Sequence, residues 1–296
     1  MLQHLMRDFT PDLVAWGAAH PLVRAMLLTS TRAIDTAPRD LLSDYDVILV
    51  VAELDPFVQD RGWLNDFGEV LVVFWDAVLP DPDFGIDQCG NVTQYADGLK
   101  IDWTLWPQVL FEQIVALPDL PAELDAGYRV LLDKDGLTGA LRPPTGRAYL
   151  PQLPSHEAYQ IHINDFLTDA PYVAKCLWRG DLLPARWCLD CDMKHTYLRP
   201  MLDWRMAIET GWSVPVGYLG KGLQRYLPAE LWAEVEHCFN EHNQADTWAA
   251  LLATMELFRR VGREVGVALG YAYPDELHER VVAYVAQIRQ LERPAT

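Results

Sequence analysis

The sequence predicts an α+β protein, with an N-terminal mixed β-sheet domain that also carries helices and a C-terminal all-helical bundle. Three observations predict it. In the first half, short runs rich in β-branched and aromatic residues alternate with helical patches, with Asp, Gly and Pro between them. In the second half, apolar residues recur at helical spacing over long segments. Between them, Arg142-Pro143-Pro144-Thr145-Gly146 is a breaker-rich stretch. We therefore expect domains at residues 1–142 and 143–296.

The elements follow from these patterns in chain order. In the first domain, the apolar runs are short enough for strands and the patches between them have helical periodicity. In the second, each long periodic segment ends at Gly or Pro, as helices commonly do. We expect strands at residues 22–28, 45–51, 70–75, 100–106 and 128–132, and helices at residues 2–19, 55–65, 107–116, 155–178, 181–209, 228–240, 244–269 and 275–291.

Composition and charge restrict the classes of function. A chain of 296 residues that is 50% hydrophobic has ample material for a buried core, which excludes disorder as its main state. With 24 Lys and Arg against 42 Asp and Glu, the formal net charge is −18. That charge repels a phosphate backbone and attracts small cations, so nucleic acid is disfavoured as a partner. The chain has no apolar run of membrane-spanning length and no signal-peptide pattern at its start, so we expect a cytoplasmic protein without a membrane partner.

Two carboxylates in one expected strand are the most informative pattern. In Asp44-Tyr45-Asp46 the two Asp side chains point to the same face, because successive strand residues alternate between faces. Adjacent carboxylates repel each other, so a cation between them is favourable. Mg²⁺ prefers hard oxygen ligands and shares its remaining positions with substrate phosphates. An isolated Asp-x-Asp pair is often a solvated strand face, so the prediction depends on what accompanies it.

A third carboxylate and a hydroxyl turn accompany this pair. Asp102 lies in another expected strand, on the face opposite to Ile101 and Trp103. If the two strands are neighbours, the three carboxylates converge on one metal site, and Asp102 serves as a ligand, as the general base or as both. Ser30 follows the first expected strand, where its hydroxyl and nearby backbone N–H groups could bind phosphates with added charge from Arg32.

These elements resemble a known family. Ser30-x-Arg32, Asp44-Tyr45-Asp46 and Ile101-Asp102-Trp103-Thr104-Leu105 are similar to the Gly-Ser-x-Arg, Asp-Tyr-Asp and Ile-Asp-Leu-Thr-Leu motifs of the aminoglycoside 6-adenylyltransferases, the streptomycin-modifying branch of the polymerase-β-like nucleotidyltransferases. The resemblance continues through the second half and covers nearly the whole chain. The segments that carry it there are Asn164-Asp165-Phe166, Pro171-Tyr172-Val173-Ala174-Lys175, Arg199-Pro200-Met201-Leu202-Asp203-Trp204, Ile208-Glu209-Thr210-Gly211, Leu257-Phe258-Arg259 and Tyr271-Ala272-Tyr273-Pro274.

The resemblance implies roles for individual residues. The first domain would be the nucleotidyltransferase domain and the second the substrate-binding domain. Asp44, Asp46 and Asp102 would be the catalytic residues and would bind Mg²⁺. The co-substrate ATP would be bound by Ser30, Arg32, Lys175 and Lys221. For a cationic acceptor, which favours carboxylates and aromatic rings, the candidates are Asp165, Asp169 and Tyr172.

Two positions depart from the family pattern. Thr29 stands where the family has a glycine, and a Cβ there could narrow the phosphate turn or forbid a positive φ. Asp165 stands where the family has a glutamate, which retracts the carboxylate by one methylene. The first departure bears on nucleotide binding and the second on the identity of the acceptor.

The predicted function is Mg²⁺-dependent transfer of AMP from ATP to a hydroxyl of an aminoglycoside, with streptomycin favoured, which inactivates the antibiotic. One alternative is the same chemistry on another small molecule or on a protein hydroxyl. Another is a catalytically inert homologue that binds a nucleotide or drug. The sequence does not indicate an oligomeric state.

Overall fold

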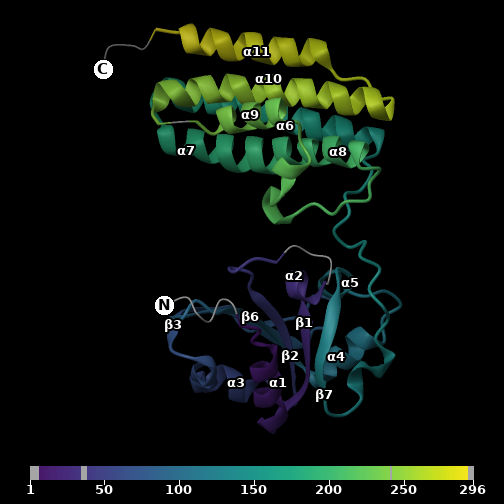
Figure 1. Ribbon diagram of the computed structural model, residues 1–296. Helices are drawn as coiled ribbons and strands as arrows, with labels where there is room; N and C mark the ends of the chain where they lie inside the picture. The colour runs from purple at the N-terminus through teal and green to yellow at the C-terminus, as the bar shows by residue number, and fades with distance from the viewer. Residues whose placement is uncertain (1–6, 35–38, 241, 293–296) are drawn as a thin grey trace. The chain divides into compact units, whose positions relative to one another are not determined.

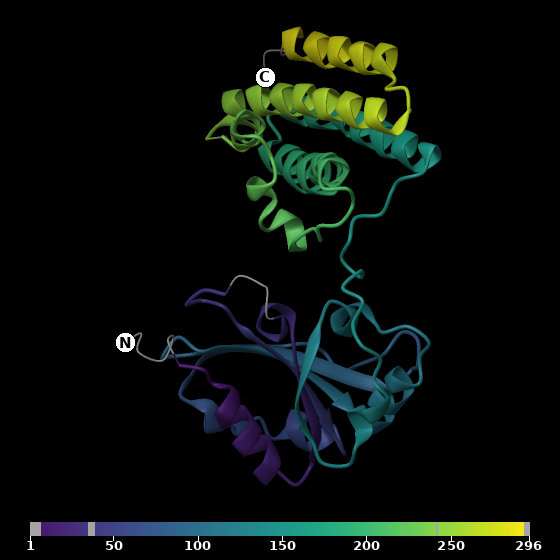
Figure 2. The same cartoon turned by 45° about the vertical axis from the view of Figure 1, so that its right-hand side comes forward.

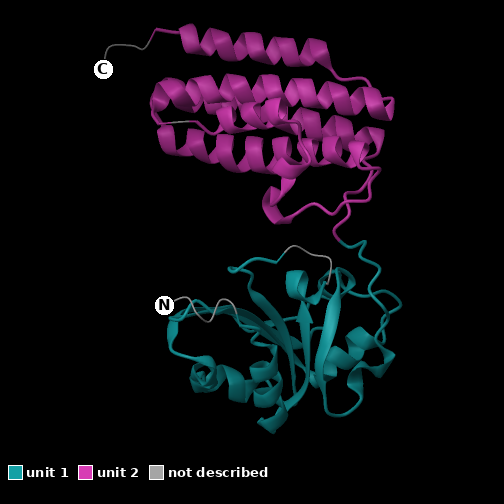
Figure 3. Cartoon of the chain, viewed as in Figure 1, with its two compact units in different colours: residues 1–148 teal, residues 149–296 magenta. Residues whose placement is uncertain are grey.

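The computed structural model describes residues 7–34, 39–240 and 242–292. The chain divides into two compact units, Met1–Ala148 and Tyr149–Thr296 (Figure 3). This division falls after the Pro143-Pro144 stretch at which the sequence pattern changes. The reason is Asp125, whose carboxylate accepts hydrogen bonds from the backbone N–H groups of Thr145, Arg147 and Ala148 at 2.7, 3.2 and 2.9 Å. The breaker-rich stretch is thereby tied to the first unit.

The described part of the first unit contains a seven-stranded sheet (Figure 1). The strand order is β3-β5-β6-β2-β1-β7, and β4 pairs with β5 beside this path. β2 and β6 pair in parallel, and the other recorded pairs are antiparallel. The strands are β1 (Val23–Thr29), β2 (Tyr45–Val51), β3 (Val70–Trp75), β4 (Leu79–Pro80), β5 (Asp87–Tyr95), β6 (Lys100–Pro107) and β7 (Tyr128–Asp133).

Helices cover the sheet unequally (Figure 2). On one face, α1, α3 and η2 pack over a large apolar core that contains Trp63, Phe67 and Trp103. On the other face, α4 packs over a smaller core that includes Leu27, Ile48, Val50 and Trp106, whereas Val72 and Phe74 on that face are exposed. The helical segments of this unit are α1 (Thr10–Ala19), α2 (Ser30–Ala33), α3 (Asp55–Gln59), η2 (Gly62–Phe67), α4 (Gln108–Val115), α5 (Ala122–Asp125) and η3 (Leu137–Ala140).

The structure confirms the predicted α+β class and all five predicted strands, with shifts of one residue at some ends. β4 and β5 were not predicted. The helix expected at residues 2–19 begins at Thr10 in the structure, and residues 1–6 lie outside the described part. The helix expected at residues 55–65 is two short pieces, α3 and η2, separated by Asp60 and Arg61.

The second unit is helical in its described residues. Its core centres on Phe166 of α6 and Phe258 of α10, whose rings stack with centroids 3.7 Å apart. The segment expected as one helix at residues 181–209 is continuous but contains a π-helix, η4. None of the described helices is both long and apolar enough to span a membrane, and the cytoplasmic location stays a prediction. The elements are α6 (His156–Arg179), α7 (Leu182–Trp187), η4 (Cys188–Leu198), α8 (Arg199–Glu209), η5 (Tyr218–Gly220), η6 (Leu223–Arg225), α9 (Ala229–Cys238), α10 (Gln244–Leu269) and α11 (Asp275–Gln290).

Candidate active site

The strand register brings the three predicted carboxylates onto one face of the sheet. Asp46 of β2 lies directly opposite Asp102 of β6 in the parallel pair, and Thr29 of β1 lies opposite Asp46 on the other side. Asp44 is two residues before Asp46 and shares its face. The alternation that produces this arrangement is driven by burial, because Tyr45 is 2% exposed on the opposite face. Side chains 56 residues apart in the chain are therefore adjacent in space.

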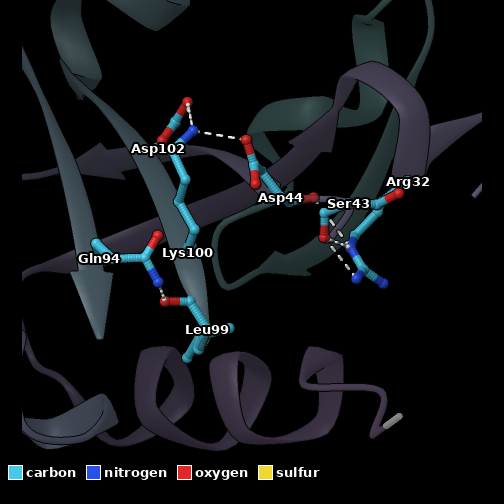
Figure 4. Close-up of polar contacts among 7 residues, drawn as sticks. All are labelled: Arg32, Ser43, Asp44, Gln94, Leu99, Lys100 and Asp102. Carbon is cyan, nitrogen blue, oxygen red and sulfur yellow. Dashed lines mark hydrogen bonds and ion pairs between the residues drawn. The ribbon is translucent and has the colours of Figure 1, made fainter. Parts of the chain in front are cut away.

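Lys100 lies between two of these carboxylates (Figure 4). Its Nζ donates to Asp44 Oδ2 at 2.5 Å and to Asp102 Oδ2 at 3.0 Å. Lys100 was not among the residues that the sequence patterns indicated. The available signal was its position two residues before Asp102 in the same strand, which places both side chains on one face.

The carboxylates form a group suited to a cation. Burial raises the pKa of Asp46, and the charges of Asp102 and Asp44 raise it further, whereas a hydrogen bond from Ser30 and the charge of Lys100 lower it. Asp102 Oδ1 is buried and accepts no hydrogen bond from any residue in the described part of the chain. Hard oxygen donors with repelling charges and an unpartnered buried oxygen fit a divalent metal ion such as Mg²⁺.

The turn after β1 carries its strain on Ser30 and not on Thr29. Thr29 has an extended backbone, with φ −124° and ψ −172°. Ser30, the first residue of α2, has φ 58°, in the left-handed region that non-glycine residues seldom adopt. The departure from the family glycine thus falls at a residue whose backbone any side chain tolerates, and the concern that Thr29 forbids a needed positive φ does not apply.

Arg32 is hydrogen-bonded to the backbone just before β2. Its Nε donates to the carbonyl oxygens of Ser43 and Asp44 at 3.0 and 2.9 Å, and its Nη2 donates to Ser43 O at 2.7 Å. Its guanidinium carbon also lies 3.9 Å from the centroid of the Tyr45 ring. These contacts position the backbone that carries Asp44. The predicted contact between Arg32 and a triphosphate stays a prediction.

The predicted acceptor residues follow one side of α6 in the second unit. Asp165, Asp169 and Tyr172 are spaced by four and then three residues, which places them on one helix face. Asp165 is exposed and lines a pocket together with Asn164 and Leu277. Tyr172 is 49% exposed. All three side chains lie within two turns of one helix, and their predicted contact with the acceptor stays a prediction.

Asp169 lies near a second carboxylate, that of Asp192, which the sequence did not predict. Burial raises its pKa to about 6, and the charges of Asp192 and Asp165 contribute. One ligand atom each of Asp169, Cys188 and Asp192 lie within 4.8 Å of one another. Asp192 belongs to η4, and only the packing of η4 against α6 brings it near.

The two predicted phosphate-binding lysines also belong to the second unit. Lys175 is on α6, with Nζ 5.7 Å from the centroid of the Tyr284 ring of α11. Lys221 is exposed and directly follows η5. Their predicted contacts with ATP stay predictions.

The family model and the relatives found by sequence name one family. A family model described as streptomycin adenylyltransferase matches residues 6–288. An aminoglycoside 6-adenylyltransferase from Bacillus subtilis (strain 168) is 29% identical over 255 residues, which cover 86% of this chain and 87% of that protein. A protein of the same name from Campylobacter jejuni is 29% identical over 274 residues, covering 92% and 90%. A crystal structure of an aminoglycoside 6-adenyltransferase from Bacillus subtilis aligns over 97% of this chain and 100% of that one, with 23% identity and a TM-score of 0.45.

Proposed function

This chain belongs to the streptomycin adenylyltransferase family, and we therefore propose that it transfers the AMP of ATP to a hydroxyl of an aminoglycoside, with streptomycin as the favoured acceptor. It is a nucleotidyltransferase enzyme. The observation that carries the proposal is the register of β2 and β6, which sets Asp46 opposite Asp102 and keeps Asp44 on the same face. A binder without chemistry would not need three repelling carboxylates at one point.

In the proposal, Asp44, Asp46 and Asp102 hold a divalent cation, Mg²⁺, which supplies charge neutralisation for the triphosphate. The residues also have tasks of their own. Lys100 keeps the carboxylates of Asp44 and Asp102 oriented. Ser30 is adjacent to this group and is hydrogen-bonded to Asp46. The proposal assigns its hydroxyl and the neighbouring backbone N–H groups to the β- and γ-phosphates.

The reaction is an in-line displacement at the α-phosphorus. An acceptor hydroxyl oxygen forms a bond to that phosphorus while the bond to the oxygen that bridges the α- and β-phosphates breaks, and pyrophosphate leaves. The hydroxyl proton passes to the Asp102 carboxylate. The proposed phosphate contacts stabilise the negative charge of the departing pyrophosphate. They are Ser30, Arg32, Lys175 and Lys221.

Acceptor recognition in this proposal uses Asp165, Asp169 and Tyr172. Guanidinium and ammonium groups form charge-assisted hydrogen bonds with carboxylates and stack on aromatic rings. Two observations support the assignment of these three residues: they share one face of α6, and Asp165 and Tyr172 are exposed.

The test is pyrophosphate release from MgATP, measured with streptomycin and with a panel of other aminoglycosides and lincosamides. We expect release that depends on streptomycin and falls at least about 100-fold in Asp46→Asn, because the variant loses a charge on which the site depends. Asp87→Asn is the matched control, since Asp87 is an exposed carboxylate of β5 and should leave release unchanged. Near-normal release by Asp46→Asn would contradict the site.

The acceptor panel distinguishes the remaining functions. Release with another acceptor keeps the chemistry and replaces streptomycin. No release with any acceptor, together with measurable nucleotide binding, would instead indicate an inert nucleotide-binding homologue.

A further inference from the structure

The line of side chains that contains the carboxylates continues toward the β3 edge of the sheet. In the antiparallel register of β5 and β6, Val92 lies opposite Asp102, and Phe74 of β3 lies opposite Val92. Directly opposed residues share a face, so one line crosses the sheet from Asp46 through Asp102 and Val92 to Phe74. In the adjoining line, Val72 lies opposite Gln94, which lies opposite Lys100.

This part of the sheet face is apolar and open. Phe74 is 63% exposed, Val72 is 61% exposed and Val92 is 37% exposed. The core under α4 occupies the same face farther along the strands, where Ile48 and Trp106 are buried. A contiguous apolar surface beside charged catalytic side chains is a common feature of ligand-binding sites.

One carboxylate is also directed over this face. Asp76 directly follows β3, and its N–H donates to Gly90 O at 3.0 Å. Its Oδ2 lies only 2.9 Å from the point that a Cβ on Gly90 would occupy. The missing side chain of Gly90 therefore makes room for the carboxylate, which is exposed and forms no ion pair within the described ranges.

We propose that Val72, Phe74, Val92 and Asp76 form the acceptor platform, on which one ring of a cationic aminoglycoside lies with its C–H face on Phe74 and an ammonium or guanidinium group at Asp76. This inference rests on the proposed function and deepens it. In an in-line displacement the attacking and leaving oxygens are on opposite sides of the phosphorus. The proposed phosphate contact, Ser30, lies beyond Asp46 at the β1 end of the line, so the acceptor approaches from the Asp102 and Val92 end.

The chemistry of the platform matches this occupant. An aminoglycoside ring has an apolar C–H face and cationic substituents, and an aromatic face with one carboxylate satisfies both. The net charge of −18 also attracts such a cation. A second copy of the chain pairing with the β3 edge is the competing occupant, and the experiment separates the two.

The experiment measures KM for streptomycin and for ATP in Phe74→Ala and Asp76→Asn. Each change should raise KM for streptomycin about 10-fold, the usual effect of losing one stacked ring or one charge-assisted hydrogen bond, and should leave KM for ATP within about 2-fold. Leu71→Ala is the matched control, because Leu71 is 66% exposed on the same strand but lies at the bulge between Val70 and Val72 and is outside both lines. It should change neither constant.

The outcomes are distinct. Equal KM values for streptomycin in Phe74→Ala, Asp76→Asn and Leu71→Ala would overturn the platform. A second result would also overturn the platform. If Phe74→Ala and Leu71→Ala both change the particle mass in light scattering and neither changes KM, the face serves self-association. Failure of the proposed function appears separately, as wild-type protein that releases no pyrophosphate. Calorimetric titration with streptomycin then still tests the platform, which predicts weaker binding by Phe74→Ala than by Leu71→Ala.

Discussion

Lys100 places a positive charge where the strand register would otherwise force acidic side chains together. Its Nζ contacts both Asp44 and Asp102, and these contacts raise the pKa of Lys100 against the opposing effect of burial. The lysine therefore stays charged at neutral pH. The ion pairs are about one-third exposed. We therefore expect them to contribute little to the stability of the fold and to act mainly by orienting the carboxylates.

Replacing Lys100 tests this role. Lys100→Gln should lower kcat/KM for ATP by roughly 10-fold or more, since the loss of a hydrogen bond between charged groups has about this effect, and should leave the thermal midpoint nearly unchanged. Lys134→Gln is the control, because Lys134 donates to His20 O at the other end of the sheet. Equal kcat/KM values in the two variants would contradict the orientation role.

At this scale, alternation predicted that Asp44 and Asp46 share a face, and that Asp102 joins them if its strand is their neighbour. The shared face of Asp44, Asp46 and Asp102 is confirmed by the register, whereas their catalytic roles stay predictions. The proximity of Asp192 to Asp169 depends on how two helices pack, and the bonds from Arg32 to the backbone depend on how a turn folds back. Neither leaves a periodic signal in the sequence.

Among the elements, β5 shows why some strands escape prediction. Its residues include Asp87, Gly90 and Asn91, which have low strand propensity. The strand forms because β3 and β6 pair with it on both sides, and tertiary pairing overrides local preference. β1 and β2 were predictable because both faces carry apolar side chains over most of their length, and β6 because apolar and polar side chains alternate along most of it.

The stacked pair between α6 and α10 should dominate the stability of the helical unit. Phe258 is fully buried against Phe166, so Phe258→Ala should lower the free energy of unfolding by about 3–5 kcal/mol. Val267→Ala, at an 83% exposed position of the same helix, should change it by less than about 0.5 kcal/mol. Urea unfolding measures both, and a loss below about 1 kcal/mol for Phe258→Ala would contradict this packing.

The whole molecule has two units with separate cores, and the change from strand to helical periodicity anticipated the architecture. A buried histidine makes the stability of the second unit depend on pH. His278 is fully buried, and its Nδ1 is hydrogen-bonded to the Tyr273 hydroxyl at 2.8 Å. Burial lowers the pKa of His278 to about 4 from 6.5, and the charge of Arg259 acts in the same direction.

The sign of the resulting pH dependence follows from proton binding. Between pH 6.5 and 4 the unfolded chain binds a proton that the native His278 does not, so stability is complete above pH 6.5 and is lost as the pH falls toward 4, by about 3 kcal/mol. His278→Gln should remove this part of the slope. Urea unfolding of both proteins from pH 4 to 7 checks it, and parallel curves would contradict the assignment.

The parallel pairing of β2 with β6 has a consequence for how acceptor range can diversify. The segment between them, residues 52–99, contains β3, β4 and β5 and therefore the whole acceptor platform. The carboxylates bracket this segment on strands that pair with each other directly. The platform therefore lies on one continuous piece of chain. Exchanging that piece with the one of a relative should alter which antibiotic is modified, and it leaves Asp44, Asp46 and Asp102 in place.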